Sequence, residues 1–171
     1  AFDSIGAVTV SNSGDLIFNT NTVLPAMEDL VVNNSTFSLI GDHSFNNISV
    51  DNGTLSLSGE VSAESVTLSN NATLTHAPTT STLEHGLDLN VTGTVTIDET
   101  SSIDVSGKGY PAGSSRGYTK GESGPTTSGG AESRCGGSYG GLGGEYSSYD
   151  TNSVYGDFTK ANDLGSGGRY H

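Results

Sequence analysis

Short runs in which hydrophobic and polar residues alternate recur along the first 106 residues of the chain. Alternation with a period of two places the hydrophobic side chains on one face of a β-strand and Thr, Ser, Asn and Asp on the other. Turn-forming Asn and Gly follow most of these runs, and segment 50–55 is echoed by segment 68–74. The pattern predicts strands at 8–10, 16–18, 30–32, 37–39, 48–50, 55–57, 66–68, 89–91, 95–97 and 103–105.

These strands belong to a repeat of about 20 residues, a length typical of one turn of a solenoid. The leading hydrophobic residues of this repeat are Val10, Val32, Val50, Leu68 and Val91. The two middle intervals between them are equal, and the first and last intervals are slightly longer. Runs of three residues are too short for a freestanding hairpin sheet, whereas a β-solenoid pairs each strand in parallel with its counterpart one coil away. We therefore predict an all-β chain with five or six coils of a right-handed parallel β-helix, the hand being the one that parallel crossovers favour. An antiparallel β-sandwich is the alternative, since it also has short strands at regular spacing.

The composition changes abruptly after residue 106. Residues 107–171 hold 18 of the 25 Gly and all seven Tyr, and no strand period continues there. We expect two parts: β-solenoid coils over 1–106, and a Gly/Ser/Tyr-rich segment over 107–171 that packs on the solenoid or extends it. The chain opens with Ala-Phe-Asp rather than Met, which suggests a mature chain or a fragment of a longer one.

Charge excludes two classes of partner. All six Lys and Arg lie after residue 106, whereas 13 of the 19 Asp and Glu lie before it. Binding to nucleic acid or to an anionic lipid surface requires clustered cations, so neither is expected.

No hydrophobic run approaches the length of a membrane-spanning helix, so no membrane insertion is predicted. Cys135 is the only cysteine and cannot form a disulfide within the chain.

The second part carries motifs in a characteristic order. Residues 103–110 read IDVSGKGY, residues 136–144 read GGSYGGLGG, and Tyr155-Gly156 precedes the GSGG of 165–168. With the strands before it, this order resembles secreted right-handed parallel β-helix proteins of the adhesin and large surface-protein kind. The resemblance implies an extracellular, cell-surface location and a structural or adhesive role, and it assigns no catalytic residue.

The sequence shows no convergent catalytic group, and we expect no enzymatic activity. Polysaccharide hydrolases need two carboxylates at a set separation, whereas neighbouring acids such as Asp98 and Glu99 point to opposite faces of a strand. Neither His nor Cys has the spacing of a zinc site. Calcium is the one metal that the acidic first part favours, and Asp98, Glu99 and Asp104 are the candidate ligands; otherwise no cofactor is expected.

Two further sets of residues are candidates for surface chemistry. Tyrosines of the second part offer ring faces that could stack on sugars, or else pack internally; they are Tyr139, Tyr146, Tyr149 and Tyr155. Asn-X-Ser/Thr sequons are candidate glycosylation sites, and they begin at Asn33, Asn34, Asn47, Asn52, Asn71 and Asn90.

These patterns together favour a rigid extracellular protein of structural or adhesive function. No amphipathic capping helix is evident at either end, so the expected partner is a second copy stacked end to end, or further coils of a longer chain. A self-assembling surface filament is therefore one form of this hypothesis. The alternative is a β-helix module that binds or degrades carbohydrate, with cell-surface glycans as its partners.

Overall fold

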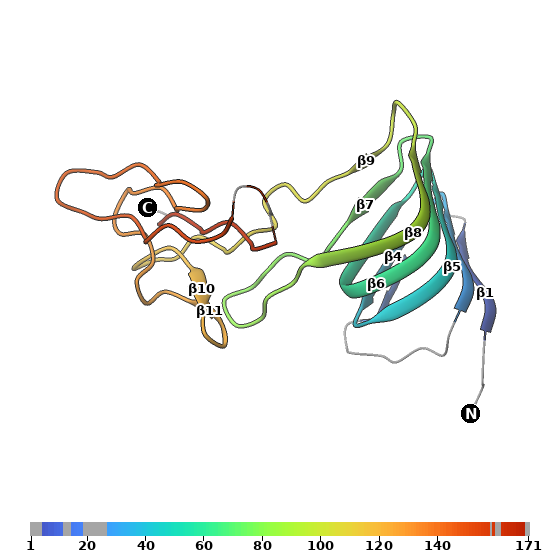
Figure 1. Ribbon diagram of the computed structural model, residues 1–171, viewed down its shortest axis with the longest axis horizontal. Helices are drawn as coiled ribbons and strands as arrows, with labels where there is room; N and C mark the ends of the chain where they lie inside the picture. Colours follow the sequence, from blue (N-terminus) through green and yellow to red (C-terminus); the bar gives the residue numbers. More distant parts are fainter. Residues whose placement is uncertain (1–4, 12–14, 19–26, 158, 160–161, 170–171) are drawn as a thin grey trace. The chain divides into compact units, whose positions relative to one another are not determined.

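The alternating runs form strands that lie side by side in a stack (Figure 1). The structure is a computed structural model, which describes residues 5–11, 15–18, 27–157, 159 and 162–169. Its strands are β1 (Ile5–Ser11), β2 (Asp15–Phe18), β3 (Met27–Asn33), β4 (Thr36–Ile40), β5 (His43–Asp51), β6 (Thr54–Ser69), β7 (Thr73–Thr75), β8 (Leu87–Ile97), β9 (Ser102–Ile103), β10 (Thr119–Gly121) and β11 (Gly124–Thr126). The described residues are all-β, and none forms a helix that could cross a membrane.

Nine of the strands belong to one sheet, and their pairing is parallel. One row runs β1-β3-β5-β6-β8, and a second row runs β2-β4-β6-β7-β9. The chain visits the two rows in turn, with β6 contributing its first half to the second row and its last half to the first. This parallel pairing contradicts the alternative of an antiparallel β-sandwich. The described antiparallel strands are only β10 and β11, which form a short hairpin.

The register follows the repeat for most of the stack. Val10 pairs with Val32, Val32 with Val50 and Val50 with Leu68, which confirms the first three predicted intervals. The fourth interval is wrong, because Leu68 pairs with Ile97 rather than with Val91.

The extra length has a physical origin. Residues 76–86 leave the sheet between β7 and β8, and β8 then carries an irregularity opposite Ala63 and Ser65, where the register shifts. Val91 consequently pairs with Ala63.

The core is a set of hydrophobic columns, each with like residues in successive strands. Parallel pairing in register puts Phe37 beside Leu55 and Leu55 beside Leu74, and all three are fully buried. The side chains with almost no exposure are Leu30, Val32, Phe37, Leu39, Ile48, Val50, Leu55, Leu57, Val61, Val66, Leu68 and Leu74. Burying each aliphatic side chain contributes about 1.5–3 kcal/mol, so these columns are the main source of stability for the stack.

The long strand β6 passes from one row to the other at Gly59. Its φ of 122° lies in a region that L side chains rarely adopt, and a Cβ there would lie 2.5 Å from the Gly41 carbonyl oxygen. Glycine is required at this bend because only hydrogen fits between the two backbones.

The chain divides into two compact units. The strand unit comprises Ala1–Ala77 and Gly86–Val105, and the glycine-rich unit comprises Pro78–His85 and Ser106–His171. Within the glycine-rich unit, the Tyr110 hydroxyl donates to Glu84 Oε2 at 2.7 Å and joins the two segments. Buried Asn152 accepts from the Ser138 amide at 2.7 Å, and ion pairs join Arg116 to Glu132 and Lys120 to Asp163. Hydrogen bonds and ion pairs thus organise a unit that has few strands of its own.

Candidate functional sites

The tight turns at one end of the strands are built on asparagine. Asn34, Asn52, Asn70 and Asn71 all have positive φ, between 46° and 65°. Most residues avoid this conformation because Cβ approaches the following carbonyl, whereas Asn tolerates it. The turns from β3 to β4, β5 to β6 and β6 to β7 therefore use the same residue type for the same backbone reason, as the sequence predicts.

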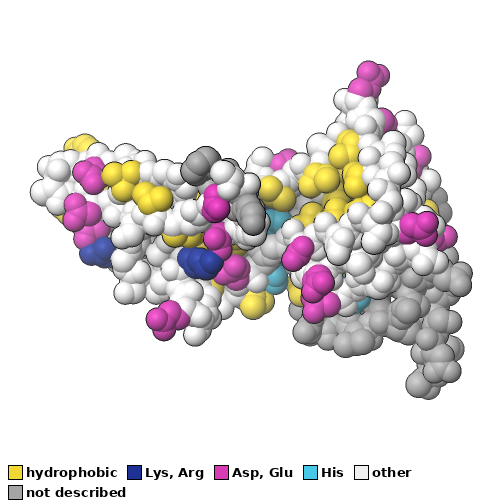
Figure 2. Space-filling view, viewed as in Figure 1, with side chains coloured by type: hydrophobic (Ala, Val, Ile, Leu, Met, Phe, Trp, Pro, Cys, Tyr) yellow, Lys and Arg dark blue, Asp and Glu magenta, His cyan; other side chains and the backbone are white. Residues whose placement is uncertain are grey.

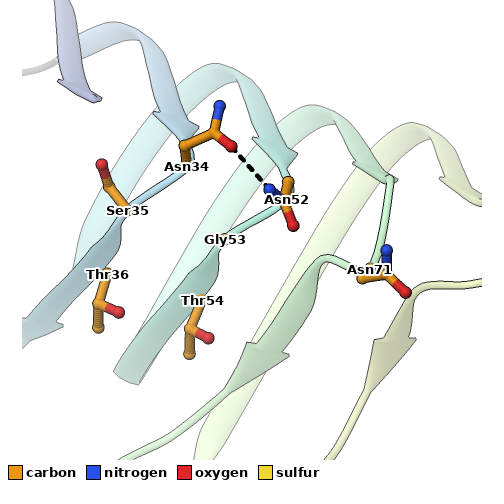
Figure 3. A pocket seen from close by; sticks show the side chains of 7 residues that line it. All are labelled: Asn34, Ser35, Thr36, Asn52, Gly53, Thr54 and Asn71. Atoms are coloured by element: carbon orange, nitrogen blue, oxygen red, sulfur yellow. Dashed lines mark hydrogen bonds between the residues drawn. The ribbon is translucent and has the colours of Figure 1, made fainter. Parts of the chain in front are cut away.

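Side-chain and backbone hydrogen bonds join successive turns. Asn52 Nδ2 donates to Asn34 Oδ1 at 2.6 Å, and Figure 3 shows these two side chains at equivalent positions of neighbouring turns. Asn34 in turn donates to Asn33 Oδ1. The backbone N–H of Asn52 donates to the Ser69 carbonyl oxygen at 3.0 Å, and this bond joins the turn to the next one.

These turns border a shallow polar depression on the strand unit (Figure 3). The groups in it are amides, hydroxyls and backbone, contributed by Asn34, Ser35, Thr36, Asn52, Gly53, Thr54 and Asn71. The depression contains no acid, base or thiol that could act as a general base or nucleophile. The depression can bind hydrogen-bonding groups, but the Asn34 and Asn52 side chains are already bonded to each other, which gives these two residues a structural role.

The predicted glycosylation residues fall into two groups. Asn33, Asn34, Asn47 and Asn52 have side chains that form hydrogen bonds to neighbouring side chains. Asn47, for example, donates to Asp29 at 2.7 Å and accepts from Ser65 at 2.7 Å. Asn71 and Asn90 are exposed, Asn71 in a turn and Asn90 on β8.

The three predicted calcium ligands do not gather. Asp98 is occupied by hydrogen bonds: its Oδ2 accepts from the Asn70 amide at 2.7 Å, and its Oδ1 accepts from the Thr100 amide and hydroxyl, both at 2.9 Å. These bonds, led by the one from Asn70, hold the pKa of the Asp98 carboxyl well below its usual range. Glu99 and Asp104 are exposed, and no group of three His, Cys, Asp or Glu that could hold a metal occurs among the described residues.

The four candidate tyrosines separate by environment. Tyr139 and Tyr155 pack edge to face with ring centroids 5.6 Å apart, and the Tyr155 hydroxyl donates to the Leu164 carbonyl. Burial raises the pKa of Tyr155, as expected for a phenol inside the unit. Tyr146 and Tyr149 instead lie on a turn, each with 44% of its surface exposed.

A guanidinium that the sequence did not indicate lies beside this turn. Arg134 lies over the Tyr146 ring, with Cζ 5.0 Å from the centroid, and Nη1 donates to the Tyr146 hydroxyl at 2.8 Å. The two residues belong to a segment that has no period, so only the folded backbone brings them together.

The last layer of the strand unit exposes hydrophobic side chains. Among the described strands, β8 pairs only with β6 and β9 only with β7. Four aliphatic side chains here remain 41–48% exposed, namely Val95, Ile97, Ile103 and Val105. Figure 2 shows hydrophobic side chains gathered over β8 and β9. The alternating pattern of the sequence predicts that these four side chains are buried. They do continue the core columns, but among the described residues no further strand layer covers them.

Comparison with known proteins does not assign any of these sites. No protein-family model matches the chain, no curated protein matches it, and no solved structure matches it. The geometry of the two units is therefore the basis for the functional assignment.

Proposed function

We propose that the strand unit is a right-handed parallel β-helix that serves as a non-enzymatic building block of an extracellular surface structure. The alternation of the chain between two parallel rows, with like residues paired from one strand to the next, supports a solenoid. The hand is the one that parallel crossovers favour. The motif resemblance supports a surface location.

The observation that carries this function is the exposed edge at β8 and β9. Val66 is fully buried beneath Val95, Leu68 beneath Ile97, and Leu74 beneath Ile103. A strand of the same type, about 4.8 Å further along the stack, would bury the exposed members in the same way and would pair the free backbone groups.

A second copy of the chain is the partner that we infer for this edge. It carries strands with the same spacing, the same parallel direction and the same Val, Leu and Ile columns. A head-to-tail interface between different surfaces of identical copies forms a closed ring if its rotation closes and an open filament if it does not; copies stacked along the direction of the strand layers form a filament. The strand unit has 12 Asp and Glu and no Lys or Arg, so like charges oppose this contact unless salt screens them.

Electron microscopy and sedimentation velocity over a concentration series at physiological salt test this assignment. We expect assemblies that lengthen with concentration and show a regular axial repeat. The variant Ile97→Lys should remain unassembled, because it places a charge in the hydrophobic column of Leu68, where the next layer would have to bury it. The control Thr96→Lys changes the neighbouring exposed position on the same strand, which pairs with Thr67 on the polar face, and should assemble like the parent.

Discrete short particles at every concentration would contradict the proposal. Equal effects of Ile97→Lys and Thr96→Lys would also contradict it, because the assembly would then depend on net charge rather than on the hydrophobic edge.

A further inference from the structure

The glycine-rich unit presents two aromatic rings on a turn that hydrogen bonds hold in place. Tyr149 N–H donates to the Tyr146 carbonyl at 3.1 Å and closes the turn. On the C-terminal side, the Glu132 amide donates to the Asp150 carbonyl at 2.9 Å. The Cys135 thiol contacts the Tyr149 carbonyl at 3.2 Å. The rings are therefore exposed on an anchored backbone rather than on a free loop.

Exposure of two such rings is unusual for this unit. Other tyrosines of the unit are packed: Tyr110 is 4% exposed, and Tyr139 and Tyr155 contact each other. Tyr146 and Tyr149 each keep 44% of their surface in solvent. An aromatic side chain buries a large area when it packs, so leaving two of them exposed forgoes stabilisation that the same fold provides elsewhere.

We propose that Tyr146, Tyr149 and Arg134 form a binding site for a neutral polysaccharide. The negative face of an aromatic ring attracts the polarised C–H bonds on the flat side of a pyranose, and the phenol hydroxyl can bond to the sugar. Arg134 holds Tyr146 through its hydroxyl at 2.8 Å, and the guanidinium retains further donors for sugar oxygens.

The chemistry around the rings selects this class of ligand. Ser147 and Ser148 separate the two tyrosines, so hydroxyl groups lie beside the rings. In binding sites of this composition, tyrosine provides a rigid contact surface, and serine and glycine allow hydrogen bonds to adapt to the ligand. Exposed Glu145 and Asp150 flank the turn, and their charge disfavours an acidic polysaccharide.

The anchored turn also explains how a few contacts with a sugar could be enough for binding. A site whose backbone is already ordered loses little conformational entropy when a ligand binds. A polysaccharide repeats its unit, so each polymer chain offers a single protein molecule many equivalent binding positions. This site lies in a different unit from the β8 and β9 edge and does not depend on the proposed assembly.

Retention of the full chain on cellulose, chitin and curdlan tests the proposal. We expect retention on at least one of these three neutral polymers, with release by the matching soluble hexasaccharide. Tyr149→Ala should weaken binding about tenfold because the stacking face is lost, whereas Tyr149→Phe should retain most of it. Leu142→Ala is the control, because Leu142 is 65% exposed in the same unit but has no ring.

Thermal unfolding followed by tyrosine fluorescence checks that each variant keeps the unit folded. Failure to bind any of the three polymers would overturn the proposal. Binding that survives Tyr149→Ala, or that falls equally with Leu142→Ala, would also overturn it, because adsorption would then be non-specific. Ile97→Lys should bind like the parent, which separates this site from the assembly edge.

Discussion

Replacing Asn52 tests whether the asparagine turns stabilise the stack in the way that their geometry indicates. Asn52 has a φ of 46° and donates to Asn34 Oδ1 at 2.6 Å. Asn52→Ala removes the hydrogen bond and places a residue with a Cβ, but without a short polar side chain, in the left-handed region. A hydrogen bond of this kind contributes about 1 kcal/mol, and the left-handed backbone costs alanine about a further 1 kcal/mol.

Asn52→Gly separates these two effects. Glycine adopts positive φ freely but cannot donate from a side chain. We therefore expect Asn52→Ala to lower the free energy of unfolding by about 2 kcal/mol and Asn52→Gly by about 1 kcal/mol. Asn46→Ala is the matched control, because Asn46 is an exposed asparagine on β5 without positive φ, and it should change stability by less than about 0.5 kcal/mol.

Urea unfolding with two probes gives the measurement. Far-ultraviolet circular dichroism follows the strands, whereas tyrosine fluorescence reports only residues after 106, where all seven Tyr lie. The circular dichroism midpoint should shift in the order Asn52→Ala, Asn52→Gly, Asn46→Ala, with little change in the fluorescence midpoint. Equal shifts for Asn52→Ala and Asn52→Gly would refute the role of the left-handed backbone, and a shift only in fluorescence would refute the placement of the effect in the strand unit.

Two further predictions concern the interior of the strand unit. Leu55→Ala should lower the free energy of unfolding by about 2–5 kcal/mol, because Leu55 is fully buried between Phe37 and Leu74; a loss below about 1 kcal/mol in urea unfolding would contradict the packed column. His43 is 8% exposed, and desolvation lowers the pKa of its ring below the ordinary 6.5, although the backbone of Ile40 and the charge of Asp42 oppose this shift. The unfolded chain therefore takes up the proton first as the pH falls below about 6.5, so stability is present above that pH and declines below it. His43→Leu should show a smaller decline below that pH, and an unchanged pH dependence would rule out His43 as a source of acid sensitivity.

The sequence predicts those parts of the fold that repeat. Parallel pairing in register needs similar residues at a fixed spacing, and the spacing from Val32 to Val50 to Leu68 is visible in the chain itself. Asparagine in the left-handed turns is predicted for the same reason, since few other residues adopt that backbone easily. The register of β8 is not predicted, because residues 78–85 belong to the glycine-rich unit and so interrupt the spacing.

The candidate sites are less visible because they depend on contacts between residues with no periodic relation. Asp98 looks like a free surface acid in the sequence, yet the amide of Asn70, far earlier in the chain, determines its role. Arg134 and Tyr146 meet only because the backbone of the glycine-rich unit folds back on itself. In that unit no hydrophobic period constrains the partner of any residue, so its contacts could not be derived from the sequence.

The energetics of the exposed edge limit the kind of assembly that it can support. Val95 and Ile97 on β8, Ile103 on β9 and Val105 just after β9 are almost half exposed, so a covering layer would gain about 1 kcal/mol for each of them. Association of two molecules costs at least about 4 kcal/mol in lost translational and rotational freedom. Side-chain burial alone therefore only offsets that cost, and the net affinity must come from the backbone hydrogen bonds of a newly paired strand. Acidic charge on both copies subtracts from this affinity, since the strand unit has no Lys or Arg to compensate it. Each interface in the stack should therefore be weak, and assembly should depend steeply on concentration and salt. A concentration series, rather than a single preparation, is needed to decide whether this edge is an interface.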